Sequence, residues 1–177
     1  MMGLSLENLD DRTRQLMLDE FQQDVAHDQL YISPHLTVVG RSDYKALLRA
    51  AIQSGTETSL ADSLRSHGRM RLTRQWRTAT GNVATELPPT AADTLAEAEF
   101  HRFYVRGVCR RALEEGIHAL VIYRAKAAIH RRVKSEAMIG VTIDASSLLE
   151  DLQTRQAVEP GPGLPAFFGS GLSVRLP

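Results

Sequence analysis

The residue types best suited to binding chemistry in this sequence are regularly spaced arginines. Arg102, Arg106 and Arg110 are four residues apart, so on a helix they lie along one line. Planar guanidinium groups pair with phosphate in bidentate geometry, so such a stripe is suited to a polyanion. In a second interpretation Glu99, Glu114 and carboxylates from the N-terminal region neutralise the stripe in an ordinary surface ladder.

More cations follow the stripe in the chain. Residues 101–134 contain nine basic residues against two acidic ones, a net charge of +7. Beyond the stripe, the cations that we assign to a polyanion surface are Arg124, Lys126, Arg131, Arg132 and Lys134. Such a block marks either a polyanion surface or a segment that pairs with acidic parts of the same chain.

A second basic block, residues 65–77, contains five arginines, no acidic residue and the only tryptophan of the chain. Arg71, Arg74 and Trp76 are predicted to contact single-stranded nucleic acid, because the backbone meets charge while a base stacks on the aromatic ring. Alternatively, Trp76 and Leu72 anchor the segment to the core while the arginines face water.

The sequence also contains residue types that metal-independent ribonucleases use for proton transfer and oxyanion stabilisation. They are His101, Tyr104, Arg124, Lys126, His130 and Glu136. No Gly-rich phosphate loop, zinc-ligand spacing or Gly-flanked serine nucleophile accompanies them. We therefore assign no catalytic residue, no metal site and no cofactor, and a metal-independent nuclease ranks below the binding functions.

The elements expected to position these groups form an α+β, mainly helical single domain over residues 1–155. Helical periodicity predicts helices over residues 6–25, 42–55, 59–67, 91–115 and 144–152. Thr90 and Asp93 form a capping-box pattern at the start of the longest helix. Short apolar runs predict a small sheet with strands near 30–32, 118–124 and 138–143. Residues 78–90, rich in Thr, Gly, Asn and Pro, are expected to form a mobile loop.

Residues 156–177 form an apolar C-terminal tail that holds four of the seven prolines and is predicted to be extended. Its residues Phe167, Phe168, Leu172 and Val174 are too many apolar groups to remain in water. They are expected to dock on the chain's own domain or on a neighbouring subunit. The second case would make the chain part of a homo-oligomer or a larger assembly.

The chain has 177 residues and a net charge of zero, which fits one domain of ordinary size. Its single cysteine, Cys109, forms no internal disulfide, and no leader precedes Leu4, so we expect a cytoplasmic protein without a membrane segment. The favoured hypothesis is a non-enzymatic polyanion-binding protein, with nucleic acid as the leading ligand. The alternative is a structural or assembly protein whose arginine surface and tail dock on partner subunits.

Overall fold

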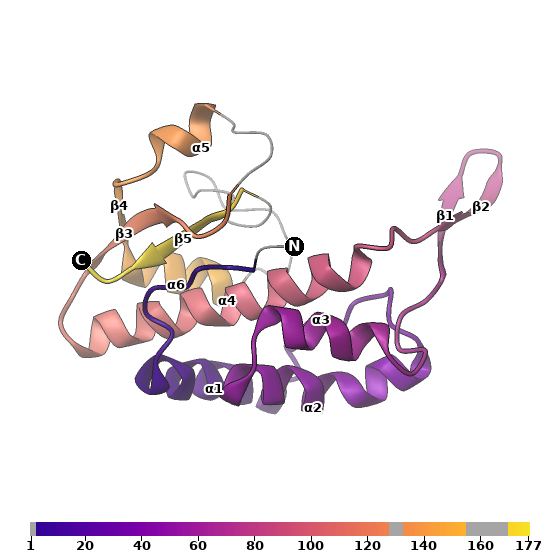
Figure 1. Cartoon of the computed structure of the whole chain (residues 1–177), viewed down its shortest axis with the longest axis horizontal. Helices are drawn as coiled ribbons and strands as arrows, with labels where there is room; N and C mark the ends of the chain where they lie inside the picture. The colour runs from indigo at the N-terminus through magenta and orange to yellow at the C-terminus, as the bar shows by residue number, and fades with distance from the viewer. Residues whose placement is uncertain (1–2, 128–132, 155–169) are drawn as a thin grey trace.

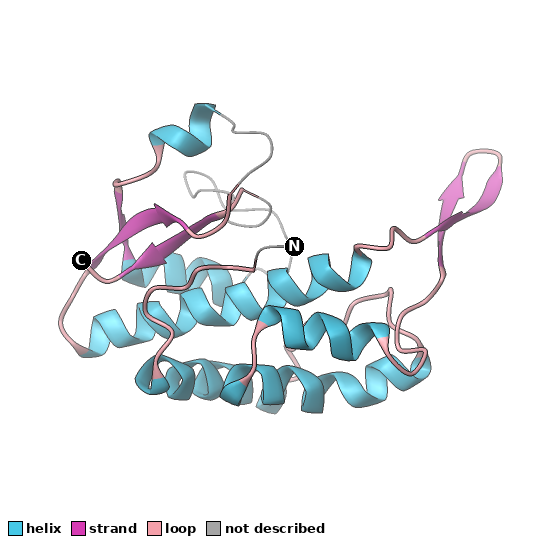
Figure 2. Ribbon diagram, viewed as in Figure 1, coloured by secondary structure: helices cyan, strands magenta, loops and turns pink. Residues whose placement is uncertain are grey.

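One long helix, α4 (Ala91–Glu114), lies at the centre of the fold. The computed structural model describes residues 3–127, 133–154 and 170–177, and every residue from Glu99 to Cys109 is buried. A helix that is covered all round needs packing partners on several sides. Three helices cover one side of α4, and a small sheet with a further helix covers the other (Figures 1 and 2). The expected α+β, mainly helical class is confirmed, with 52% of the described residues helical.

The helices on the first side are α1 (Asp11–Ala26), α2 (Val38–Ser54) and α3 (Glu57–Arg65). Side chains cap their first turns: Asp10 accepts a hydrogen bond from the Thr13 N–H at 3.0 Å, and Thr37 accepts one from the Gly40 N–H at 3.1 Å. Thr56 caps α3 in a capping box with Ser59. These caps correct the predicted starts near residues 6, 42 and 59, because each helix begins where a side chain satisfies its free N–H groups.

The predicted extent of α4 is confirmed, but the reason given for its start is wrong. Thr90 makes no side-chain capping bond. Farther along, Gly107 lets α1 come close to α4, since a Cβ added there would lie 2.7 Å from the Met17 Cγ atom and 3.1 Å from the Thr13 carbonyl oxygen. The helix is therefore positioned by close packing against α1 rather than by its cap.

The sheet beside α4 has three antiparallel strands in the order β4 (Thr142–Asp144), β3 (Ala119–Arg124), β5 (Leu172–Arg175). The predicted strand at 118–124 is confirmed. The predicted strand at 138–143 is corrected to its last residues and Asp144, because the Val141 N–H bonds back to the Met138 carbonyl in a turn. Residues 30–32 form no strand, so the short apolar run there was not a sheet signal.

Two short helices and the last strand complete this side. α5 (Val133–Ala137) precedes β4, and α6 (Ala145–Thr154) follows it and packs on α4. The predicted cap of α6 is confirmed, because Asp144 accepts from the Ser147 N–H at 2.7 Å. Leu172 and Val174 of the tail are buried in this chain's own core, so these two side chains dock on their own domain. Phe167 and Phe168 lie outside the described residues.

A hairpin of β1 (Thr73–Thr78) and β2 (Gly81–Glu86) projects from one end of the body (Figure 1). The register pairs Thr78 with Gly81, so two residues form the turn. The hairpin corrects the loop predicted over 78–90. The run Gly81 to Glu86 has no apolar periodicity, and among the described elements its main packing partner is β1. Its sequence pattern therefore resembled a loop.

Candidate polyanion interface

The arginine stripe of α4 lies inside the molecule, which corrects its predicted place on the surface. Arg106 is only 1% exposed. Its Nε donates to Glu20 at 2.8 Å, and its two terminal nitrogens donate to the two carboxylate oxygens of Asp24 at 2.7 and 2.8 Å. Two carboxylates of α1 thus match this guanidinium group with bidentate geometry.

The two neighbours of Arg106 in the stripe are matched as well. Arg110 donates to the other Glu20 oxygen at 2.9 Å, and Arg102 donates to Glu99 at 2.5 Å in a buried pair. Burial raises the pKa of Glu99 to about 7, and the charge of Arg102 opposes that shift. The premise that this stripe is left unmatched by the chain's own carboxylates is therefore wrong.

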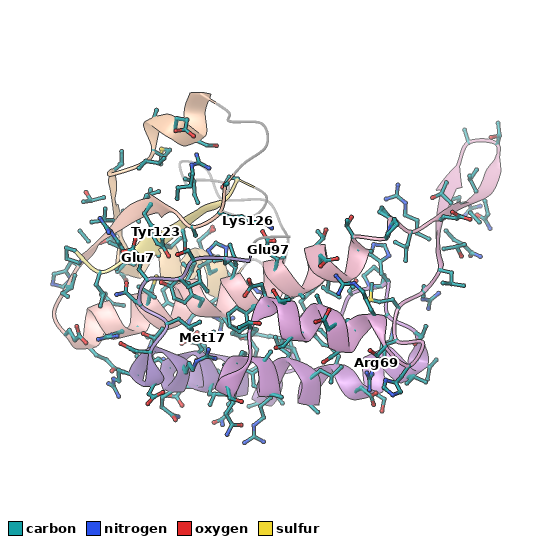
Figure 3. The ribbon with its side chains drawn as sticks, in the orientation of Figure 1. Glu7, Met17, Arg69, Glu97, Tyr123 and Lys126 are labelled. Atoms are coloured by element: carbon teal, nitrogen blue, oxygen red, sulfur yellow. The ribbon has the colours of Figure 1, made fainter. Side chains whose placement is uncertain are left out.

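The cations after β3 divide into matched groups and groups outside the description. Arg124 donates to Glu136 at 2.5 Å and to the Ser170 carbonyl at 3.1 Å. Lys126 pairs with Glu97 of α4 (Figure 3). Arg131 and Arg132 lie outside the described residues, and so does the side chain of Lys134.

Two of the groups proposed for proton transfer, His101 and Tyr104, are buried in the core. The Nε2 atom of His101 lies 2.8 Å from the Ser173 hydroxyl oxygen in the core, and burial lowers the His101 pKa to about 4. Tyr104 is buried beside it, and burial raises the pKa of its phenol well above the usual value. His130 lies outside the described residues. A polymer substrate cannot reach the first two side chains without opening the core.

Within the described ranges, no group of three or more His, Cys, Asp or Glu side chains is arranged to hold a metal ion. In the same part of the chain, no helix is both long enough and apolar enough to cross a membrane.

A second cationic stripe, which the sequence analysis missed, lies on the outer face of α2. Arg41, Lys45 and Arg49 are exposed and four residues apart, and they border the face of α2 that buries residues such as Tyr44 and Leu48. Among residues 3–127, 133–154 and 170–177, no carboxylate is within ion-pair distance of these three cations. The sequence contained a signal for this stripe, because the three cations recur every fourth residue among apolar residues at helical spacing.

The nearest acid in the sequence, Asp43, is already engaged. It accepts a hydrogen bond from the Nε of Arg69 at 2.8 Å, at the end of the helical layer from which the hairpin rises (Figure 3). The α2 stripe is therefore not neutralised by its own helix.

Backbone contacts fix the hairpin base to the start of α2. The Thr37 N–H donates to the Arg69 carbonyl at 2.9 Å, and the Arg71 N–H donates to the His35 carbonyl at 2.8 Å. A Cβ at Gly40 would lie 2.2 Å from the Arg69 carbonyl oxygen, so only glycine allows this approach. The α2 stripe and the segment leading into β1 therefore hold one position relative to each other.

The hairpin extends this set of cations. Arg71, Arg74 and Arg77 are exposed; Arg71 donates to the Leu36 carbonyl at 3.1 Å and Arg74 to the Thr85 hydroxyl at 3.3 Å. Nothing is described of the Trp76 side chain, which belongs to β1. We name the following six residues the basic track: Arg41, Lys45, Arg49, Arg71, Arg74 and Arg77.

The fold and this surface define an α+β protein with a buried, internally matched arginine network and a separate exposed basic track. Comparisons of the chain with protein-family models, curated proteins and solved structures give no match. A function has to be argued from the chemistry of the surface.

Proposed function

We propose that this protein binds a polyanion, with nucleic acid as the leading ligand, through the basic track. One observation carries the proposal: Arg41, Lys45 and Arg49 have no carboxylate partner among the described residues. Like charges four residues apart on a helix repel by a few tenths of a kcal/mol per pair. A phosphate backbone relieves that repulsion and releases counterions, which favours binding at low salt.

The net charge of the chain does not oppose this function. The total is zero, but a large part of the positive charge is cancelled inside the fold, as at Arg106 with Glu20 and Asp24. What a ligand meets is the local surface, and a local basic surface attracts polyanions even on a neutral protein.

The test is fluorescence anisotropy with a labelled oligonucleotide of about 20 nucleotides at low salt, a length chosen to exceed the site size of common single-strand binding folds. The variant changes Arg41, Lys45 and Arg49 to Ala. Its matched control changes Arg12, Arg65 and Arg175 to Ala, which removes the same charge from exposed arginines that pair with Glu114, Asp93 and Glu7.

We expect the native chain and the control to bind and the α2 variant to bind at least about tenfold more weakly, because it loses three phosphate contacts. Absence of binding by the native chain at low salt would refute the proposal. Equal losses in the two variants would show that only total charge matters, and the basic track would no longer be the site.

A second candidate function, assembly with other subunits, is favoured by the hairpin. A two-stranded hairpin is marginally stable alone in water and is stabilised by packing against something else. Light scattering of the native chain should be compared with a variant in which a Gly-Ser link replaces residues 73–86. The Leu87 N–H bonds to the Leu72 carbonyl at 2.8 Å, so the ends of that link are already adjacent. If both proteins are monomers, the hypothesis that the chain self-associates is refuted.

A further inference from the structure

Exposed apolar side chains gather at the same end of the molecule as the basic track. Leu72 is 86% exposed and Val38 is 83% exposed, and Val39 and Val83 are also exposed. Val38 and Val39 open α2, Leu72 precedes β1, and Val83 is in β2. Scattered single apolar residues on a surface are ordinary, but a group that adjoins exposed cations offers two kinds of contact at once.

The register of the hairpin places apolar and cationic positions on one face. Residues directly opposite in an antiparallel pair share a face, and successive residues alternate between faces. Arg74 is opposite Thr85, and Trp76 is opposite Val83. Leu72 directly precedes β1, and its carbonyl accepts a hydrogen bond from the Leu87 N–H at 2.8 Å at the base of the hairpin. The register therefore places a cationic position, Arg74, and an apolar position, Val83, on one face of the hairpin.

We infer that the ligand of the basic track is a single-stranded nucleic acid, with its phosphates on the α2 stripe and hairpin arginines and its bases against the apolar face of the hairpin. This inference rests on the proposed function. The positive charge of the basic track favours a polyanion as the ligand. The exposed apolar residues beside it favour a polyanion that also has apolar groups to contact. A duplex hides the flat faces of its bases, whereas a single strand presents a negative backbone and apolar base faces together.

The first experiment uses the native chain and three probes of equal length: an oligothymidine, the same backbone without bases, and a duplex. Anisotropy titrations at one salt concentration give the three affinities. We expect the oligothymidine to bind at least about tenfold more tightly than the abasic strand, because base stacking on side chains strengthens binding by about that factor or more. Equal affinity for the oligothymidine and the abasic strand would overturn the inference, and so would tighter binding of the duplex.

The second experiment changes the apolar face and leaves every charge in place. The variant carries Leu72→Ser and Val83→Ser. Its control carries Ile139→Ser and Val141→Ser, two residues beside β4 whose exposed fractions, 41% and 43%, are close to the 40% of Val83. The preference for oligothymidine over the abasic strand should fall at least about threefold in the variant and stay unchanged in the control, because only the variant loses surface on which bases stack. An unchanged preference in the variant would contradict the inference.

The only tryptophan of the chain, Trp76, provides a direct signal from the hairpin. Its fluorescence should be quenched by the oligothymidine and not by the abasic strand, and circular dichroism checks that the variants remain folded. If light scattering instead shows an oligomer that Leu72→Ser with Val83→Ser dissociates, the apolar face is a protein contact and the inference fails. Failure of the native chain to bind any probe would refute the proposed function, whereas equal binding of all three probes would refute only this inference.

Discussion

Two arginine-rich helices of this protein share one spacing and have opposite environments. On α4, Arg102, Arg106 and Arg110 are engaged by carboxylates of α4 itself and of α1. On α2, Arg41 and the two cations that follow it at the same spacing face solvent without a carboxylate partner among the described residues. The first set holds the fold together, and the second is available to a ligand.

The difference comes from the residues between the cations. Between the arginines of α4 the sequence has Phe103, Val105 and Val108, which are buried on other sides of the helix. The whole circumference of the helix is therefore covered, and its charged side chains need partners inside the fold. On α2 the buried residues, such as Tyr44 and Leu48, keep to one face, and the cations lie beside that face. Equal spacing of charges thus predicts a line on a helix but does not predict whether that line is buried.

The largest loss of stability is expected from Arg106→Ala, which disrupts the buried arginine network of α4. The change leaves Glu20 and Asp24 buried without their main counter-charge, and removing one partner of a buried pair typically costs about 3–5 kcal/mol. Urea unfolding followed by circular dichroism measures the loss. A loss below about 1 kcal/mol would mean that the network does not stabilise the fold.

A somewhat smaller effect is expected from acid, again confined to the buried region. His101 is neutral in the folded state, because burial lowers its pKa from 6.5 to about 4. The unfolded chain binds a proton there first, so this contribution to stability is complete above pH 6.5 and is lost as the pH falls through about 4.

Its full size is roughly 3 kcal/mol, from about 1.4 kcal/mol per unit of pKa difference. Urea unfolding over this pH range should therefore give a weaker pH dependence for His101→Gln than for the native chain. Parallel curves for the two proteins would show that His101 is protonated in the fold as readily as in the unfolded chain.

Gly107→Ala tests the buried network in another way, because it is expected to move the carboxylates of α1 away from the α4 arginines. The added methyl group would meet Met17 and the Thr13 carbonyl of α1, the helix that carries Glu20. Overpacking of this kind typically costs about 1–3 kcal/mol. Thermal unfolding should show the loss, and Ala112→Gly, which only removes a methyl group from the same helix, gives the scale of an ordinary substitution there.

The smallest effect is expected at the exposed stripe. Changing Arg41, Lys45 and Arg49 to Ala should alter the free energy of unfolding by less than about 0.5 kcal/mol per residue, because exposed side chains without partners contribute little. Removing three repelling cations can even stabilise α2 slightly. A large destabilisation in urea would indicate a structural role for these cations and would erase the contrast with α4.

Much of the fold could be predicted from the sequence, because local signals decide it. The long helix ending before Gly116, the strand at 119–124 and the Asp144 cap follow from periodicity and cap chemistry. The strand at Leu172–Arg175 was harder to predict, since it pairs with β3 across nearly fifty residues of chain. The hairpin was missed because every side chain described in its two strands is exposed or half-buried.

The candidate site was less predictable. The pairing of Arg106 with Glu20 and Asp24 joins residues more than eighty positions apart, and no local pattern reports such a contact. The exposure of Arg41 could have been inferred only in part, since Arg41 is three residues from the buried Tyr44 and therefore borders the buried face of α2. Its lack of a partner could not, because that depends on where every acid of the fold is placed.

The most direct test of the distinction between matched and unmatched cations is the slope of log affinity against log salt for a single-stranded oligonucleotide. Each phosphate contact with a single strand contributes about 0.7 to the steepness of that slope. We predict that changing Arg41, Lys45 and Arg49 to Ala makes the slope shallower by about 2, whereas the same change at the paired Arg12, Arg65 and Arg175 leaves it unaltered. Equal slopes for the native chain and the α2 variant would contradict this prediction.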